Sequence, residues 1–180
     1  MREDRDFALL EDCKRGDRQA LNSLVRRYER PVYNAAYRML GSPDDAADVT
    51  QTTFLKALEN LDRYNPEYKF FSWIYRIAVN ESINQLNRRK RVVALDEDRP
   101  SGTRGPEDQL EMGHLDSDIQ AALHQLSMDH RAVIVLRHFV ECSYRQIGEI
   151  LQIPEKTVKS RLFSARKRMK DSLEGRGYER

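Results

Sequence analysis

The sequence has few residues that interrupt helices and few that form disulfides. Its 180 residues include 8 glycines, 6 prolines and 2 cysteines. Cys13 and Cys142 are too few and too far apart for a disulfide framework or a cysteine-based zinc site, so we interpret each as a small buried hydrophobic residue. The scarcity of Gly and Pro, with abundant Leu, Ala, Arg and Glu, predicts a helical protein.

Long apolar runs are also absent. No stretch approaches the 18 or so apolar residues that a membrane-spanning helix needs. The start, Met1 to Asp6, has mixed charge, and no apolar segment follows it. We therefore expect no secretory signal, no membrane insertion and a cytoplasmic location.

Enzyme motifs are missing as well. The sequence contains no Gly-rich phosphate loop, no dinucleotide fingerprint and no H-E-x-x-H. Its four histidines, His114, His124, His130 and His138, lack metal-ligand spacing with a third partner. We expect no catalytic residues, no metal and no cofactor.

Charge is nearly balanced overall but segregated along the chain. The 31 basic and 29 acidic residues give a net charge of +2, yet residues 91–116 carry −4 and residues 117–180 carry +4. Residues 155–170 hold seven basic side chains and one acidic one. Positive charge gathered on a short stretch indicates nucleic acid as the partner.

Residues 96–108 are acidic, rich in Pro and Gly, and almost free of apolar residues, which predicts a flexible linker. We expect an all-α fold of two small helical domains, 1–92 and 115–180, joined by a flexible acidic linker, 93–114. No segment alternates between apolar and polar residues as a strand would.

The N-terminal part predicts consecutive helices. A short one opens near Phe7 and stops at Gly16, and Asp17 caps the next. Pro31 is compatible with a break and restart of the helix, and Gly41 ends that helical region. Ser42 and Pro43 then begin another helix. A long helix starts near Phe70 or Phe71 and reaches the basic run at residues 88–91.

The C-terminal part contains a helix-turn-helix pattern. Ser143 and Gln146 form a capping box, Pro154 separates two helices, and the second helix is basic. Such a helix start presents polar side chains to base edges in the major groove, with phosphate contacts further along. An ordinary amphipathic bundle helix is the alternative. The candidate DNA-binding residues are Glu155, Lys156, Thr157, Lys159, Ser160, Arg161, Arg166 and Lys167.

Six of the chain's aromatic residues lie between Tyr64 and Tyr75, just before a basic helix. Aromatic rings beside cations suit unpaired bases, which stack on the rings. Aromatics at helical spacing are equally typical of a core. We expect both, with Phe71 and Ile74 inside and Trp73 near the surface.

Four blocks resemble bacterial sigma factors of the sigma-70 class, in the compact extracytoplasmic-function group. They are residues 28–33, 48–54, 71–80 and 143–150 with 157–161. The resemblance runs from about Phe7 to Leu173, leaving out the linker. It implies a promoter-specificity subunit that binds core RNA polymerase at the clamp of the largest subunit and the flap of the second largest. An anti-sigma factor is a further implied partner.

The resemblance also implies roles for residues. In the family, the helix matching 42–61 docks on the polymerase clamp, although Ala47 and Thr52 replace its usual acids here. The implied docking residues are Asp45, Asp48, Gln51 and Phe54. Tyr64 and Asn80 match a pocket for a flipped base of the minus-ten element. The implied contacts to the melted minus-ten strand are Tyr64, Phe71, Trp73, Arg76, Asn80, Asn84, Arg88 and Arg89.

The C-terminal helix-turn-helix matches the part of the family that recognises the minus-thirty-five element. We hypothesise that the acidic linker mimics nucleic acid inside the polymerase. A free-standing helix-turn-helix regulator, dimeric on a two-fold-related operator, is the alternative function. A helical interaction protein is a third, and the basic helix argues against it.

Overall fold

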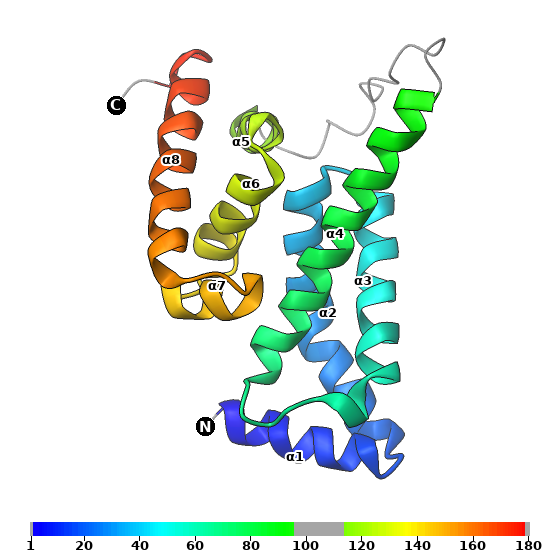
Figure 1. The fold of residues 1–180 in the computed structure, drawn as a ribbon. Helices are drawn as coiled ribbons and strands as arrows, with labels where there is room; N and C mark the ends of the chain where they lie inside the picture. Colours follow the sequence, from blue (N-terminus) through cyan, green and yellow to red (C-terminus); the bar gives the residue numbers. More distant parts are fainter. Residues whose placement is uncertain (1, 96–113, 179–180) are drawn as a thin grey trace.

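The computed structural model describes residues 2–95 and 114–178, and the described residues are helical throughout with short connections (Figure 1). The flexible linker predicted from the sequence falls largely on residues 96–113, which lie outside the described residues. The helices are α1 (Arg2–Lys14), α2 (Arg18–Leu40), α3 (Pro43–Glu59), η1 (Leu61–Arg63), α4 (Phe70–Leu95), α5 (His114–Gln125), α6 (Met128–Ile134), the π-helical η3 (Val135–Phe139), α7 (Tyr144–Leu151) and α8 (Glu155–Glu174).

Local signals set the helix ends of the first unit, α1 to α4. The Asp17 carboxylate accepts hydrogen bonds from the backbone N–H groups of Gln19 and Ala20 at the start of α2. Gly41 ends α2 with φ +67°, a conformation that side chains disfavour. Ser42 caps α3 through its hydroxyl, and Pro43 follows in the first turn. These predicted caps are confirmed.

The break with which Pro31 is compatible does not occur, because α2 runs without interruption from Arg18 to Leu40. A proline inside a helix removes one backbone hydrogen bond and crowds the preceding turn. Tyr28 and Val32, on either side of it, are buried in the core. We attribute the continuity to this burial, which offsets the lost bond.

In the second unit, α5 to α8, the Ser127 hydroxyl caps α6 and the capping box of Ser143 and Gln146 is present at α7. Gln152 takes a left-handed conformation that turns the chain into α8. Val158 and Leu162 of α8 are buried against the rest of the unit. The helix-turn-helix therefore forms as the sequence predicts.

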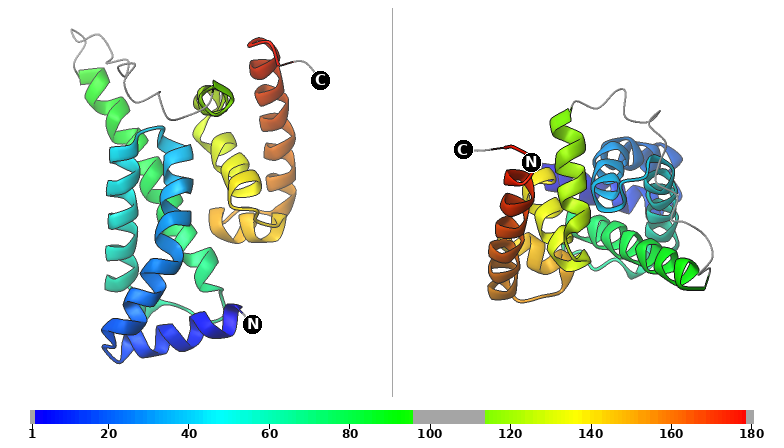
Figure 2. Two further views of the ribbon diagram at one scale, coloured as in Figure 1. Left: turned by 180° about the vertical axis from the view of Figure 1, so that it is seen from behind. Right: turned by 90° about the horizontal axis from the view of Figure 1, so that it is seen from above.

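The second unit packs against α2 and α4 of the first, as Figures 1 and 2 both show. α3 lies on the other side of the first unit, away from α8. One continuous apolar core joins residues of both units, from Leu10 of α1 to Ala165 of α8. No helix in the described part of the chain is both long and apolar enough to cross a membrane.

Candidate nucleic-acid and partner interfaces

One face of α8 is basic and exposed. At 100° per residue, positions 156, 160, 163 and 167 share a face, and all four side chains are exposed. Lys159 lies beside this face, ion-paired with Glu155 at 3.0 Å and 6.0 Å from the centre of the Tyr144 ring. This reading face of α8, residues 156, 159, 160, 163 and 167, offers cations and a hydroxyl to a DNA groove.

Phe163 lies at the centre of the reading face with 75% of its surface exposed, the most exposed large apolar side chain described. Our sequence interpretation missed it because phenylalanine at helical spacing usually marks a core. The signal that could have found it is its position between Lys159 and Lys167, outside the apolar set of Val158, Leu162 and Ala165. An exposed apolar ring among cations suits contact with a thymine methyl group.

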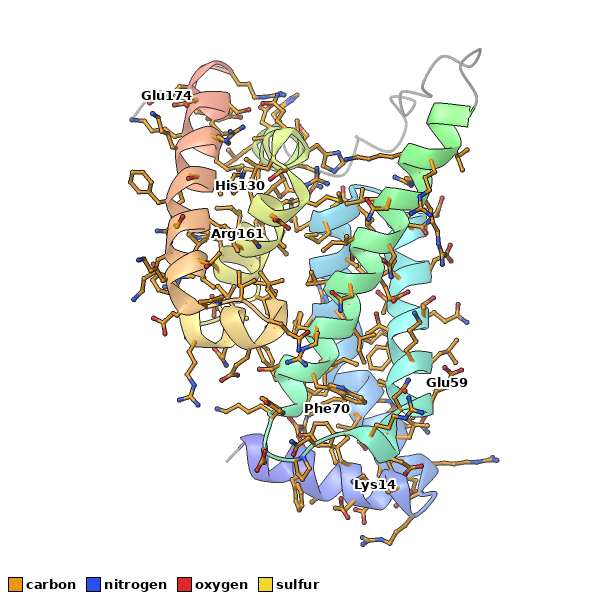
Figure 3. The ribbon with its side chains drawn as sticks, in the orientation of Figure 1. Lys14, Glu59, Phe70, His130, Arg161 and Glu174 are labelled. Carbon is orange, nitrogen blue, oxygen red and sulfur yellow. The ribbon has the colours of Figure 1, made fainter. Side chains whose placement is uncertain are left out.

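Four of the predicted DNA-binding residues lie outside this face: Glu155, Thr157, Arg161 and Arg166. Arg161 points toward α6, where its guanidinium pairs with Asp129 at 2.8 Å (Figure 3). Thr157 is half-buried on the same flank. Arg166, on the opposite edge, donates to His138 at 3.3 Å. Burial and the nearby guanidinium groups lower the pKa of His138.

The turn before α8 depends on Gly148. A Cβ there would stand 2.9 Å from the carbonyl oxygen of Ile153, which is backbone and cannot move aside easily. The Gly148 carbonyl also accepts the N–H groups of Gln152 and Ile153. The absence of a side chain lets α7 and α8 meet closely and so sets the direction of the reading face.

A second candidate surface runs along α4. Trp73, Asn80, Asn84 and Arg88 recur at spacings of seven, four and four residues, so they share one stripe of the helix. Asn80, Asn84 and Arg88 are exposed and Trp73 is half-exposed. We call these four residues the α4 stripe. It combines an aromatic ring, two amides and a cation, the groups that bind unpaired bases and backbone phosphates.

The other predicted strand-binding residues lie elsewhere. Tyr64 is buried, its ring 5.2 Å from that of Trp73, and its hydroxyl donates to the backbone carbonyl of Tyr68 at 2.5 Å. Burial raises the pKa of Tyr64. Phe71 is half-buried, its ring centre 4.8 Å from that of Tyr75, and Ile74 is fully buried.

Arg76 lies between the α4 stripe and the second unit. Its Nη2 donates to the backbone carbonyl of Glu149 in α7 at 2.7 Å, and its guanidinium lies 5.9 Å from the centre of the Tyr68 ring. Arg89 is turned away from the stripe and pairs with Asp45 of α3.

A third candidate surface is an apolar groove of about 600 Å³ between α2 and α3. Leu55 and Leu58 are exposed along it, 53% and 39% respectively, which is unusual for leucine and marks the groove as a contact surface. Its lining residues are Val25, Glu29, Arg30, Tyr33, Ala47, Thr50, Gln51, Phe54, Leu55 and Leu58.

The predicted docking residues divide between this groove and the α3–α4 contact. Gln51 and Phe54 line the groove, and Asp48 is exposed one turn before Gln51. Asp45 faces α4 instead, where it accepts from Gln85 at 3.2 Å and pairs with Arg89. In the described residues, no group of three or more His, Cys, Asp or Glu side chains is placed to hold a metal ion.

Comparison with known proteins matches both units to one family. Residues 24–92 match the model of Sigma-70 region 2, and residues 116–169 match that of Sigma-70, region 4. The chain is 34% identical to the ECF RNA polymerase sigma factor SigW of Bacillus subtilis, covering 91% of this chain and 94% of that protein. It is 34% identical to the ECF RNA polymerase sigma-E factor of Haemophilus influenzae, covering 94% and 95%.

Two solved structures have similar folds. CnrH, in complex with the cytosolic domain of CnrY, has a TM-score of 0.75 at 26% identity, covering 95% of this chain and 98% of CnrH. The sigma factor RpoE from Bartonella quintana, in complex with the anti-sigma factor NepR, has a TM-score of 0.71 at 27% identity, covering 85% and 96%.

Proposed function

Since the chain belongs to the sigma-70 family, in its extracytoplasmic-function group, we propose that its two helical units divide promoter recognition between them. As a sigma factor it is not an enzyme; it directs core RNA polymerase to promoters. Residues 1–92 form the unit for polymerase docking and the minus-ten element. Residues 115–180 form the unit for the minus-thirty-five element, and 93–114 link them. The chain functions in the cytoplasm, together with the polymerase.

The reading face of α8 contacts the minus-thirty-five duplex. Lys156, Lys159 and Lys167 supply positive charge to phosphates and base edges, and Ser160 supplies a hydroxyl. Phe163 packs against a thymine methyl group. Arg161 mainly stabilises the position of α8, through its ion pair with Asp129 of α6, and contributes less to DNA contact. Gly148 lets the N-capped α7 pack closely against α8, and this packing places the start of α8 in the major groove.

The α4 stripe contacts the melted minus-ten strand. A base taken out of the stack meets the half-exposed ring of Trp73. Asn80, two helical turns further along the same stripe, offers its amide to the strand. Arg88 meets the strand's phosphates near the end of the stripe. The buried ring of Tyr64 packs against that of Trp73, with 5.2 Å between ring centres. Tyr64 therefore fixes the position of Trp73 in the α4 stripe and does not itself contact the strand.

The groove between α2 and α3 is the docking site for the clamp of the polymerase's largest subunit. Exposed Leu55 and Leu58 supply apolar area, while Glu29, Arg30 and Asp48 supply charge at its edges. Asp45 contributes indirectly, by fixing α3 against α4. The flap of the second-largest subunit is the partner proposed for the second unit. An anti-sigma factor is the regulatory partner, by analogy with the complexes of CnrH and RpoE.

The observation that carries this function is the presence, on one chain, of a basic duplex-reading face, a separate strand-binding stripe and an exposed apolar groove. A free-standing helix-turn-helix regulator needs only the first. That the acidic linker mimics nucleic acid inside the polymerase stays a hypothesis. Transcription initiation assays on a variant whose linker acids are neutralised would test it.

Run-off transcription tests the function. Purified chain is mixed with sigma-free core RNA polymerase and a pool of genomic promoter fragments from the source organism. We expect transcripts that require the chain and share upstream and minus-ten sequences. If nothing initiates, and the chain binds duplex DNA without co-eluting with core polymerase, the regulator function replaces this one.

A further inference from the structure

A row of cations lies along one edge of α8, beside the reading face. Lys159, Arg166 and Lys170 are spaced seven and four residues apart, so they share one stripe of the helix, and all three are exposed. Lys159 pairs with Glu155 at 3.0 Å, and Lys170 pairs with Glu174 at 3.3 Å. Arg166 differs from both. Among the described residues its guanidinium has no carboxylate partner, and the positions four residues before and after it hold no acid.

The partner of Arg166 is a histidine. Its Nε donates a hydrogen bond to Nε2 of His138 at 3.3 Å, and both side chains are exposed. An imidazole accepts at Nε2 only while it is neutral, with its proton on Nδ1. Because this bond uses Nε, the two terminal NH₂ groups of Arg166 stay available. Such a pair of N–H groups is the geometry that binds two oxygens of a phosphate.

His138 lies in the π-helical turn η3, which joins α6 to α7. The N–H of Val140 bonds to the carbonyl of Val135 at 3.1 Å, which gives the wide turn of a π-helix. Such turns are rare and often occur at functional sites. Here the turn holds His138 against the exposed edge of α8, 28 residues further along the chain.

The charges that act on His138 are positive. Partial burial first, and then the charges of Arg166 on α8 and Arg137 on η3 itself, lower the pKa of His138. Among the described residues, no acidic side chain acts against them. An anion bound beside the ring would supply the missing negative charge.

Charged and titratable side chains on the other elements packed against η3 have partners of their own. Arg38 of α2 pairs with Asp116, Asp129 of α6 with Arg161, Arg131 of α6 with backbone carbonyls, Arg145 of α7 with Glu149, and the Tyr144 ring of α7 with Arg137 and Lys159.

Resting on the function proposed above, we infer that His138 and Arg166 form one site for a backbone phosphate of the minus-thirty-five duplex, at which His138 takes up a proton from solvent as the duplex binds. In the free chain the neutral imidazole accepts from Arg166. A bound phosphate takes the N–H groups of Arg166, and its negative charge favours the imidazolium. The protonated Nε2 of His138 then donates to a phosphate oxygen and no longer accepts from Arg166.

Proton uptake sets the sign of the pH dependence. The cations lower the pKa of His138 in the free chain, and the phosphate raises it in the complex. Duplex binding therefore tightens as the pH falls through the pKa of the complex, and the gain is complete below the pKa of the free chain. Because phosphate contacts carry no sequence information, this gain is the same for any duplex. The site adds a pH-dependent affinity to the sequence recognition by the reading face.

Titration of the full-length chain with a randomised 20-base-pair duplex at pH 6 and pH 8, at constant salt, tests the site. The wild type should bind up to about tenfold more tightly at pH 6, the change that one unit of pKa shift produces. His138→Gln can still accept from Arg166 but cannot take up a proton, so it should lose most of this difference. His138→Lys carries a fixed charge and should bind at pH 8 about as tightly as the wild type binds at pH 6.

His114→Gln is the matched control. His114 is an exposed histidine at the start of α5, and α5 bonds through Asp118 to Arg176, beyond the end of α8 and away from its reading face. This variant should keep the full pH dependence of the wild type. Arg166→Ala should weaken duplex binding and lower its salt slope by about 1, as the loss of a phosphate contact does.

Nuclear magnetic resonance of the histidine rings measures the protonation directly, with the His138 signal assigned from His138→Gln. We expect the pKa of His138 to lie below the usual histidine value in the free chain and above it in the duplex complex. Inorganic phosphate is the second probe. If it raises the pKa of His138 as much as the duplex does, the site takes free phosphate and the assignment to DNA falls.

Two further results would overturn the inference. One is an equal pH dependence of duplex binding in His138→Gln and the wild type. The other is weaker binding at pH 6, which would mean that His138 only positions Arg166. Run-off transcription by the wild type at pH 8 keeps the two proposals apart. Transcription without proton-linked binding refutes the phosphate site alone, whereas proton-linked duplex binding without transcription refutes the sigma function alone.

Discussion

The guanidinium of Arg76 donates a 2.7 Å hydrogen bond to the backbone carbonyl of Glu149, joining α4 of one unit to the helix-turn-helix of the other. Its acceptor is backbone, so changing the Glu149 side chain leaves it in place. Its donor is one of the residues that we propose contact the melted minus-ten strand. On that proposal, protein and DNA compete for the same guanidinium.

Phe163→Ala should weaken promoter duplex binding without changing its salt dependence. Losing an apolar contact to a thymine methyl group costs about 1–2 kcal/mol and releases no counterions. Lys167→Ala is the informative contrast, because losing a phosphate contact lowers the salt slope by about 1. Titrations of a selected upstream duplex at several salt concentrations measure both. A changed slope for Phe163→Ala would argue against a base-edge role.

Gly148→Ala should destabilise the second unit by about 1–3 kcal/mol, the usual range for overpacking at a site that cannot relax. The new Cβ meets the Ile153 carbonyl at 2.9 Å. Gly175→Ala is the control, since its Cβ would keep 3.5 Å from any neighbour and its backbone is already helical. Thermal unfolding followed by circular dichroism compares them. Equal midpoints would mean that the turn adjusts freely.

Leu55→Asp should prevent co-elution with core polymerase while preserving the fold. The side chain is 53% exposed, so little core packing is lost, but a charge enters the apolar groove between α2 and α3. Asp62→Ala, an exposed change outside the groove lining, serves as the control. Gel filtration with core polymerase gives the answer. Undiminished co-elution would place the clamp contact elsewhere.

The helices and their ends could be predicted because their causes are local. Asp17, Ser42 and the Ser143–Gln146 box each bond backbone groups two or three residues away, which a sequence displays directly. A break at Pro31, which the sequence allows, does not occur because burial of Tyr28 and Val32, a long-range effect, outweighs a local cost. The contact between the units could not be predicted for a related reason. Arg76 of α4 donates to the backbone carbonyl of Glu149, and Arg131 of α6 donates to that of Met39, and every residue carries such an acceptor.

Site residues divide in the same way. The face of α8 follows from helical spacing, so the exposure of Lys159 and Ser160 could be predicted, but Phe163 is typical of a core by residue type. Arg161 and Asp45 were plausible binding residues by position. Only the packing reveals their intramolecular partners, Asp129 and Arg89.

Cys142 reports chemically, without a label, on how firmly the second unit is held. The thiol is 1% exposed, and burial raises its pKa to about 12. Cys142 and Tyr75 of α4 belong to the same apolar core, and the pKa of Tyr75 is raised first by burial and then by the charge of Cys142.

At pH 8 only roughly one thiol in ten thousand is then a thiolate, which is the reactive form. In a Cys13→Ala background, Cys142 should react slowly with a disulfide reagent, about tenfold faster per unit of pH up to pH 10. Adding Arg38→Ala, which removes hydrogen bonds from α2 to Asp116 and Gln120 of α5, should accelerate the reaction at every pH. A second unit held less firmly on the first exposes the thiol and returns its pKa toward that of a free cysteine. An unchanged rate would mean that the second unit buries Cys142 without help from α4.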